Sequence, residues 1–162
     1  MSTREEKRRE EKRDEEQRKI KEVEENEKKF MAFHKILKQF MKMDECQPFL
    51  EPVDWAGLGL WDYPDIVTNP MDLGTVKRFL DEGTRYSSVD DAADDGRQVW
   101  TNCMLYNDAG SEFFLLAQKQ NEKFDEALEE AYATKEEQIR HIDPDAICTV
   151  EERAQMARQI LK

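Results

Sequence analysis

The sequence predicts an all-α domain built as a bundle of four helices. Apolar residues recur at the three- and four-residue spacing of one helix face, in four separate stretches between residues 30 and 136. One long connection separates the first two stretches, and two short connections join the others. Four amphipathic helices with a single crossover connection are typical of a four-helix bundle.

The bulk composition narrows the class of protein. The chain of 162 residues is long enough for one domain with a real hydrophobic core. Its N-terminus lacks the apolar stretch of a secretory signal, and no run of about 20 apolar residues predicts a membrane-spanning helix. Three widely spaced cysteines and two histidines argue against a disulfide scaffold or a zinc finger. They favour a reducing compartment, the cytosol or the nucleus.

The net charge of -12 is carried by the chain after residue 29. Residues 1–29 contain 11 Lys and Arg against 11 Asp and Glu, whereas residues 30–162 contain 14 against 26. Because an acidic body repels nucleic acid and attracts cations, direct DNA binding is disfavoured and a lysine-rich peptide is favoured as partner. Acidity that serves only solubility is an equal alternative at this point.

Residues 1–29 are expected to form a charged arm. They are nearly all Glu, Lys, Arg, Asp and Gln, and Ile20 and Val23 are the only sizeable aliphatic side chains after Met1. No apolar heptad stripe is sustained, so a stable coiled coil is not predicted. Opposite charges four residues apart can support a solvated helix, and the sequence leaves a lone charged helix and a disordered arm both open.

The first core helix is predicted to begin at Phe30 and to end near Asp44. Six residues at helical spacing form its apolar face: Phe30, Phe33, Ile36, Leu37, Phe40 and Met41. The connection that follows, residues 44–71, is rich in proline and glycine but also in large apolar side chains. A loop of this length within a compact domain is usually functional, so we expect it to fold onto the bundle and line a cavity.

Capping residues mark the remaining helices. The second helix is predicted to start after Asp72 and to end at Gly83. Ser88 resembles the cap of the third helix, which ends at Asn107, and Ser111 opens the fourth. The positions that share one face of each helix are Leu73, Val76, Phe79, Leu80, Val89, Ala92, Val99, Trp100, Cys103, Tyr106, Phe114, Ala117, Asn121, Phe124, Leu128 and Ala131.

A tail follows the bundle. Asp143 and Pro144 break the chain, and Thr149 starts a capping signal for a short amphipathic helix. The predicted organisation is therefore a charged arm (1–29), a bundle (30–136) and a tail (137–162).

No catalytic constellation is evident in the sequence. It has no GxSxG, no HExxH and no phosphate-binding glycine loop, and His34 and His141 are expected to be structural or exposed. A group of aspartates on the third helix is interpreted as a solvated face and not as a metal site: Asp90, Asp91, Asp94 and Asp95. We therefore predict a protein that is not an enzyme and that uses no metal and no cofactor.

Asn107 is the candidate binding residue. An asparagine at a helix end is usually a cap, and its chemistry alone leaves that interpretation open. Tyr106 precedes it, Phe113 follows it, and the long connection adds many apolar side chains. If these groups converge at one end of the bundle, they form an apolar pocket with a single amide at its base.

Several motifs, in this order along the chain, resemble those of bromodomains. Residues 52–54 (PVD) and 62–77 (DYPDIVTNPMDLGTVK) resemble the ZA loop and the start of helix A, and residues 100–107 (WTNCMLYN) resemble the end of helix B. The resemblance runs from about Phe30 to about Ala133. It implies a left-handed bundle of four helices, Z, A, B and C, with a long ZA loop, that binds acetyl-lysine.

The resemblance also implies roles for single residues. Asn107 matches the asparagine that donates its side-chain amide to the acetyl carbonyl, and Tyr63 matches the tyrosine that reaches this carbonyl through water. Phe113 falls at the gatekeeper position. The other expected acetyl-lysine-binding residues are Pro48 and Phe49 of the shelf, Val53, Leu58 and Leu60 of the ZA-loop wall, and Cys103 and Tyr106 beside the asparagine.

Two positions depart from the family pattern. Gln47 stands where one bromodomain group has a shelf tryptophan, so the groove there is expected to be less apolar unless Trp55 or Trp61 compensates. Gly96 stands where many bromodomains carry a large apolar residue, which leaves either a cavity or a large neighbour such as Trp100.

Such a pocket favours acetylated over unmodified lysine. Acetylation removes the charge and leaves an amide with a methyl group. A charged lysine would lose several kcal/mol of solvation in an apolar pocket without a carboxylate at its base. Four acidic residues near the expected rim suit basic neighbours of the modified lysine or are ordinary surface charge: Glu51, Asp54, Asp108 and Glu112.

The sequence thus predicts a non-catalytic reader of acetylated lysine in chromatin or transcription regulation. Histone tails are the expected peptides, other chromatin proteins the expected partners, the nucleus the expected location, and the protein is expected to be monomeric. The alternative is a structural module that assembles partners through the charged arm. The segment from Thr149 resembles the opening of the extra-terminal domain of bromodomain and extra-terminal proteins, which would make the chain part of a longer protein.

Overall fold

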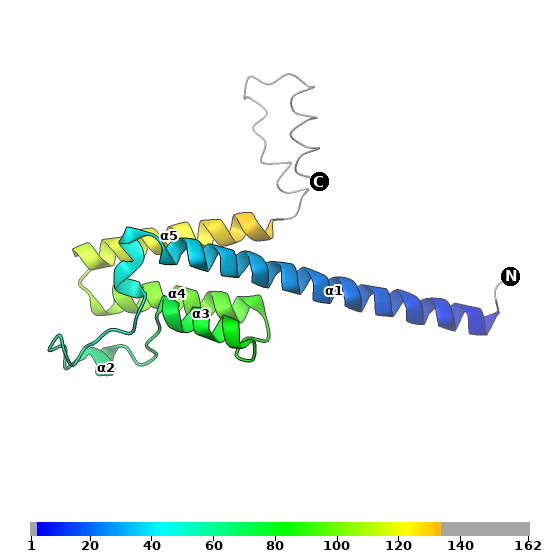
Figure 1. Ribbon diagram of the computed structural model, residues 1–162, viewed down its shortest axis with the longest axis horizontal. Helices are drawn as coiled ribbons and strands as arrows, with labels where there is room; N and C mark the ends of the chain where they lie inside the picture. The colour runs from blue at the N-terminus through cyan, green and yellow to red at the C-terminus, as the bar shows by residue number, and fades with distance from the viewer. Residues whose placement is uncertain (1–2, 134–162) are drawn as a thin grey trace, which may run out of the picture.

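The structure is a computed structural model that describes residues 3–133, and this part of the chain is helical and without strands (Figure 1). The four bundle helices are α1 (Arg4–Met41), α3 (Leu73–Glu82), α4 (Val89–Tyr106) and α5 (Glu112–Tyr132). The long connection contains the short helices η1 (Asp44–Phe49) and α2 (Tyr63–Ile66). The predicted four-helix bundle is confirmed, whereas the expected tail helix lies outside the described residues. None of the described helices is long and apolar enough to span a membrane.

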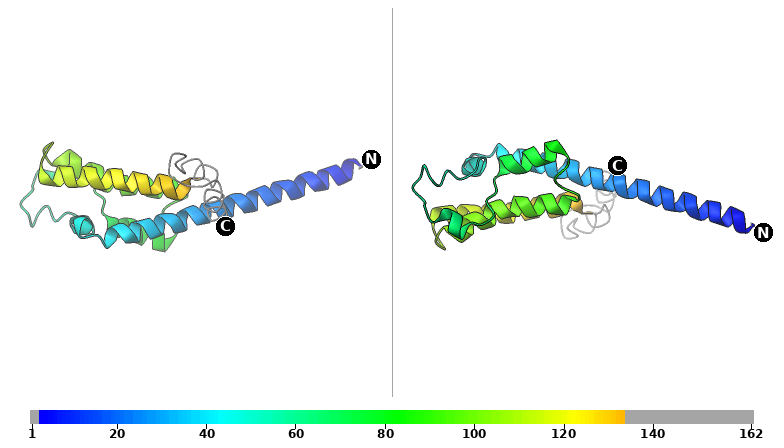
Figure 2. Two further views of the ribbon diagram at one scale, coloured as in Figure 1. Left: turned by 90° about the horizontal axis from the view of Figure 1, so that it is seen from above. Right: turned by 90° about the horizontal axis from the view of Figure 1, so that it is seen from below.

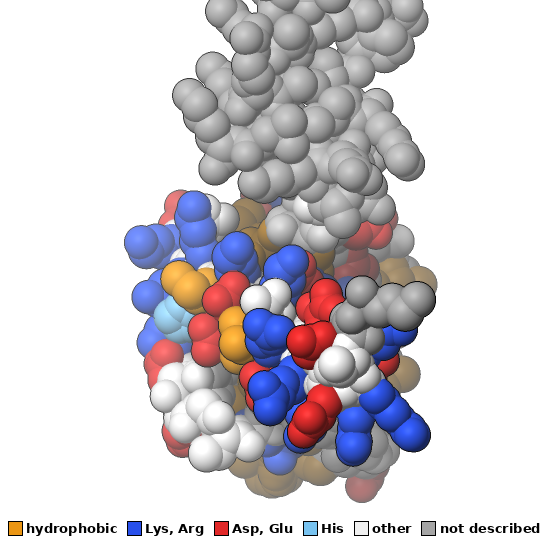
Figure 3. Space-filling model, turned by 90° about the vertical axis from the view of Figure 1, so that its right-hand side faces the viewer, with side chains coloured by type: hydrophobic (Ala, Val, Ile, Leu, Met, Phe, Trp, Pro, Cys, Tyr) orange, Lys and Arg blue, Asp and Glu red, His pale blue; other side chains and the backbone are white. Residues whose placement is uncertain are grey.

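Helix α1 joins the charged arm to the bundle without a break (Figures 1 and 2). The Thr3 hydroxyl caps it by accepting the backbone N–H of Glu6, whose carboxylate accepts the backbone N–H of Thr3 in return. The buried residues of α1 all lie between Phe33 and Phe40, and its earlier turns project past the bundle into solvent. Viewed along this projecting end, acidic and basic side chains are interspersed (Figure 3). Of the two states that the sequence left open for the arm, the structure has the helix.

Aromatic rings of α1, α4 and α5 form the centre of the core. The rings of Phe33, Phe40 and Trp100 each pack against the ring of Phe124, and Phe40 also packs against Trp100. The ring centroids lie 5.5 to 6.3 Å apart, mostly edge to face. Gly96 provides the space for this cluster, because a Cβ there would lie only 2.7 Å from Cζ of Phe124. The large neighbour that fills the space at Gly96 is therefore Phe124 and not the expected Trp100.

The helix ends follow the predicted caps. The side chains of Asp72, Ser88 and Ser111 each accept the backbone N–H of the third residue that follows them. Gly83 ends α3 with φ of 72°, a left-handed conformation that suits glycine.

The predicted apolar face of α5 is wrong at its C-terminal end. Ala131 is exposed, whereas Gln120, which was not predicted, is fully buried. A helix with 3.6 residues per turn drifts away from a seven-residue repeat, so the stripe turns out of the core after Leu128.

The long connection packs on the bundle at its two ends but not at its tip. Phe49 in η1, Tyr63 in α2 and the adjacent Val67 are buried. At the tip, Leu58 is 67% exposed and Trp61 is 71% exposed. The expectation that the whole connection folds onto the bundle is therefore only partly correct.

Candidate ligand-binding cavity

A cavity of about 480 Å³ opens at the end of the bundle opposite the arm, where the long connection, α4 and α5 meet. Its size is that of a typical small-molecule site. The structure brings all the acetyl-lysine-binding candidates of the sequence together on its wall: Pro48, Phe49, Val53, Leu58, Leu60, Tyr63, Cys103, Tyr106, Asn107 and Phe113.

Asn107 is the C-cap of α4 and is half-buried in the cavity wall. Its Nδ2 donates a hydrogen bond to the carbonyl oxygen of Cys103 at 2.9 Å, and its backbone N–H donates to the same oxygen at 3.0 Å. A primary amide carries two N–H donors. Nδ2 also donates a hydrogen bond to Sγ of Cys103 at 3.5 Å. A thiol sulfur is a weak acceptor, so the cap fixes the side chain while the second N–H has only a weak partner that a ligand carbonyl can replace.

Tyr63 and Tyr106 form the neighbouring wall. Their rings pack edge to face with centroids 4.9 Å apart. The Tyr106 hydroxyl donates to the Asp62 carboxylate at 2.8 Å, and this hydrogen bond raises the pKa of Tyr106. Burial raises the pKa of Tyr63. Both hydroxyls therefore keep their protons at neutral pH, and the Tyr63 hydroxyl remains a donor.

Cys103 and Phe113 connect α4 to α5 at the cavity. The Cys103 thiol donates to the carbonyl oxygen of Phe113 at 3.4 Å, and burial raises the pKa of this thiol. Cys103 therefore presents a neutral, mostly apolar group to a ligand. The Phe113 side chain is 50% exposed and stands at the cavity mouth.

The shelf side of the cavity is built on η1. Phe49 packs edge to face on Trp100 with centroids 5.0 Å apart, which holds Pro48 at the rim. The side-chain amide of Gln47 donates to the carbonyl oxygens of Met41 and Met43, at 3.2 and 3.1 Å. Gln47 thus satisfies carbonyl groups at the end of α1, where helical partners run out.

Neither tryptophan of the long connection replaces the missing shelf ring. Trp55 and Trp61 pack against each other, with ring centroids 5.9 Å apart, and neither lines the cavity. Gln47 therefore lines this wall without a tryptophan from the long connection beside it.

Asn102 is a wall residue that sequence reasoning missed. It is 4% exposed, and its Nδ2 donates to the backbone carbonyl of Asn69 at 2.8 Å while its Oδ1 accepts from Gln98. It thereby ties the end of the long connection to α4 and positions the loop that carries Tyr63. A signal was available, because Asn102 stands three residues after Val99 on the core face of its helix.

The acidic candidates divide into two pairs. Glu51 and Asp54 line the cavity, whereas Asp108 and Glu112 do not. The Asp54 carboxylate also accepts the backbone N–H of Gly57 at 3.0 Å, which stabilises a turn.

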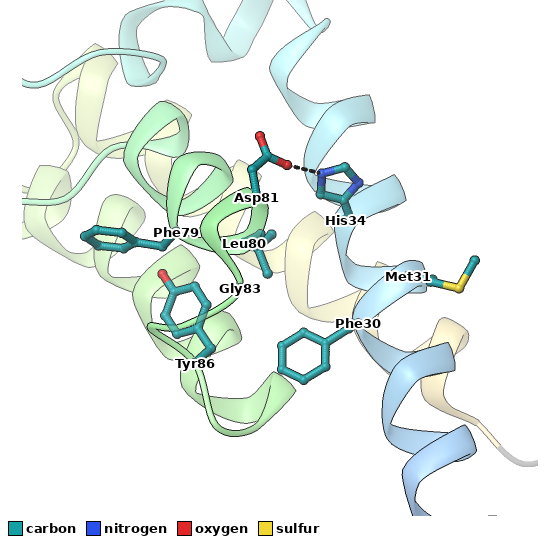
Figure 4. Close-up of a pocket in the computed structure, with 8 residues that line it drawn as sticks. All are labelled: Phe30, Met31, His34, Phe79, Leu80, Asp81, Gly83 and Tyr86. Carbon is teal, nitrogen blue, oxygen red and sulfur yellow. Dashed lines mark hydrogen bonds and ion pairs between the residues drawn. The ribbon is translucent and has the colours of Figure 1, made fainter.

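A second cavity, of about 400 Å³, lies between α1 and the end of α3 (Figure 4). Phe30, Leu80 and Tyr86 contribute to its wall. Its polar groups are already paired, because His34 Nε2 lies 3.2 Å from the Asp81 carboxylate, which also binds Lys77 at 2.9 Å. It offers no amide with a spare donor comparable to that of Asn107.

Aspartates of α4 bind neighbouring side chains: Asp91 binds Ser87, Asp94 binds Arg97 and Asp95 binds Tyr86. Within residues 3–133, no group of three or more His, Cys, Asp or Glu side chains is arranged to hold a metal ion.

Known proteins are similar to this chain over most of the bundle. The family model of the bromodomain matches residues 33–119. The chain belongs to the bromodomain family. The four bundle helices are thus the Z, A, B and C helices of a bromodomain, and the connection between α1 and α3 is its ZA loop.

Three relatives are similar to this chain over its bromodomain, and two of them are named transcription factors. It is similar to Transcription factor GTE2 (49% identity over 90 residues) and Transcription factor GTE1 (40% over 94 residues) of Arabidopsis thaliana. It is also similar to Bromodomain-containing factor 2 of Saccharomyces cerevisiae, with 40% identity over 101 residues. The matches cover 56%, 58% and 60% of this chain but only 15%, 24% and 16% of the relatives, so they concern a minor part of each relative's length.

Proposed function

We propose that this bromodomain binds acetylated lysine in a peptide through Asn107 and performs no catalysis. The observation that carries the proposal is the second side-chain N–H of Asn107, which lies at the wall of a mostly apolar cavity and has only the weak acceptor Sγ of Cys103 as its partner. An acetyl carbonyl needs one donor, and this N–H supplies it. The hydrogen bond contributes about 1 kcal/mol, and each buried methyl or methylene group of the ligand about 0.8 kcal/mol.

Unmodified lysine fits this cavity poorly. The carboxylates that line the cavity are those of Glu51 and Asp54, and both residues are exposed to solvent. An ammonium group placed beside Asn107 would lose its hydration without gaining a counter-charge, which costs several kcal/mol. Selectivity for the acetylated form thus follows from the charge of the ligand and not from its length.

Histone tails in the nucleus are the peptides that we propose, together with other chromatin proteins as partners. The excess of acidic residues after residue 29 attracts basic tails and disfavours nucleic acid. The transcription factor names of the Arabidopsis relatives support this setting. We also propose that the domain acts as a monomer.

Calorimetry with three matched peptides tests the proposal. One peptide carries acetyl-lysine, the second unmodified lysine and the third norleucine, which is uncharged but lacks the acetyl carbonyl. We expect only the acetylated peptide to bind with measurable affinity. Equal binding of the acetylated and unmodified peptides would overturn the reader function, and equal binding of the norleucine peptide would remove Asn107 from it.

A further inference from the structure

Trp55 and Trp61 form an exposed aromatic corner, the Trp corner, at the tip of the ZA loop. Their rings lie 5.9 Å apart and nearly at right angles, with an interplanar angle of 78°. Trp61 is 71% exposed and Trp55 is half-buried. Because tryptophan is a highly buried residue on average, two adjacent indoles open to solvent indicate a surface made for contact.

The loop that carries the Trp corner is held by its own backbone hydrogen bonds. The backbone N–H of Leu60 donates to the carbonyl of Trp55 at 2.7 Å, and that of Leu58 donates to the carbonyl of Asp54 at 3.0 Å. Gly59 has φ of 72°, which turns the chain between the two indoles. The backbone that carries the two indoles is therefore fixed by the loop itself, which limits the entropy lost when a ligand binds there.

The Trp corner adjoins the rim of the cavity. Asp54 and Leu60, the chain neighbours of Trp55 and Trp61, both line the cavity. An extended peptide advances by about 3.3–3.6 Å per residue. A side chain about two to four positions from a bound acetyl-lysine lies about 7–14 Å along the peptide from it, and these positions are the candidates for a contact with the Trp corner.

The charge around the Trp corner selects the kind of group that it attracts. Residues 43–76 contain seven acidic residues and no Lys, Arg or His. Two of the acidic residues are adjacent to the indoles, Asp54 before Trp55 and Asp62 after Trp61. This field repels phosphate groups, anionic lipid surfaces and a second copy of the same loop, and it attracts cations. The π face of an indole is also the best aromatic surface for a cation.

We propose that the Trp corner binds a lysine or arginine side chain of the same peptide that presents acetyl-lysine to the cavity. The proposal rests on the proposed function and extends it to the sequence around the modified lysine. The peptide would then make two contacts, an uncharged side chain beside Asn107 and a charged one against the indoles.

Calorimetry with paired peptides tests this second contact. Each pair carries acetyl-lysine and has either arginine or citrulline, its neutral isostere, at one position two to four residues from the acetyl-lysine. In the unmodified protein we expect the citrulline peptide of the matching register to bind about two- to fivefold more weakly, the size of an exposed cation–π contact. We expect Trp61→Ala to lose most of the difference between the two peptides of that pair. Leu115→Ala, which removes another exposed apolar side chain outside the cavity, should keep the difference.

Three outcomes overturn parts of the proposal separately. Equal binding of arginine and citrulline peptides at every position would remove the Trp corner as a cation site and leave acetyl-lysine recognition intact. Trp61→Leu keeps apolar area without a π face, so a preserved preference for arginine in this variant would assign it to the loop charges alone. Absence of binding by all acetylated peptides would instead overturn the proposed function.

Discussion

The side-chain amide of Asn107 has two N–H groups, and each has a different use. One holds the amide against the carbonyl of Cys103 at the end of α4. The other has only the weak sulfur acceptor of Cys103, and we propose that it turns to the acetyl carbonyl of a ligand. Capping and binding are thus not competing interpretations of this residue, because the cap orients the donor. A flexible asparagine would lose side-chain entropy on binding, whereas this one has lost it on folding.

Replacing Asn107 tests this division of roles. We expect Asn107→Ala to abolish measurable binding of an acetylated peptide and to lower the free energy of unfolding by about 1 kcal/mol, the contribution of one hydrogen bond. Asn107→Asp keeps the size of the side chain but removes both N–H donors, so it should also lose binding. Calorimetry and thermal unfolding measure the two effects. An alanine variant that is largely unfolded would show that the residue serves mainly as a cap.

Residues that belong to a recognisable motif could be assigned a role from the sequence, whereas residues that bind backbone carbonyls could not. The resemblance to bromodomains implied the roles of Asn107 and Tyr63, and these roles remain predictions. Gln47 and Asn102 bind backbone carbonyls, those of Met41, Met43 and Asn69, that only the folded chain brings within reach. Every residue has a backbone carbonyl, so the sequence does not indicate which carbonyl a side chain will bind. It therefore showed polar residues at unusual positions but not their hydrogen-bond partners.

At the scale of helices, the packing of α4 against α5 depends on the absence of a side chain at Gly96. Glycine in a helix costs about 1 kcal/mol relative to alanine. The phenyl ring of Phe124, held among Phe33, Phe40 and Trp100, uses the space that results. The helix is thus weaker by itself but packs more closely on its neighbour.

We expect Gly96→Ala to destabilise the domain although alanine favours the helix. The new Cβ would lie 2.7 Å from Cζ of Phe124, and overpacking of a filled core costs about 1–3 kcal/mol. This exceeds the gain in helix propensity, so urea unfolding should show a net loss of about 1 kcal/mol. In a Phe124→Leu background the same change should become neutral or stabilising, since the ring is gone. Greater stability of Gly96→Ala in both backgrounds would contradict the account.

Helix ends were easier to predict than helix faces. A cap such as Asp72 or Ser111 binds a backbone N–H three residues away, so the local sequence is enough to predict it. The burial of Gln120 instead depends on Glu45 in η1, whose carboxylate accepts from its side-chain amide at 2.6 Å. The solvent exposure of the ZA-loop tip is likewise a property of the assembled bundle, and hydrophobic side chains at Leu58 and Trp61 did not reveal it.

At the scale of the whole molecule, the arm and the bundle share one helix but not one core. The first buried residue of α1 is Phe33, and the turns before Phe30 are exposed. Oppositely charged side chains four residues apart, such as Glu15 and Lys19, contribute only about 0.2–0.5 kcal/mol each. The helix of the arm is therefore stabilised mainly because it continues into the folded bundle, whereas the arm adds little to the stability of the bundle.

Deleting residues 1–25 tests whether the arm assembles partners, the alternative role that its charge pattern suggested. Asn26 then stands at the new helix start as a suitable N-cap, and every buried residue of α1 remains. The deletion removes 9 basic and 10 acidic residues, so the charge that attracts a basic peptide barely changes. We expect helical circular dichroism to fall by the contribution of the arm, with the melting temperature and peptide affinity nearly unchanged and both chains monomeric by light scattering. Self-association of the full chain that disappears on deletion would instead assign the arm a scaffolding role beside the reader cavity, because the two properties would then separate.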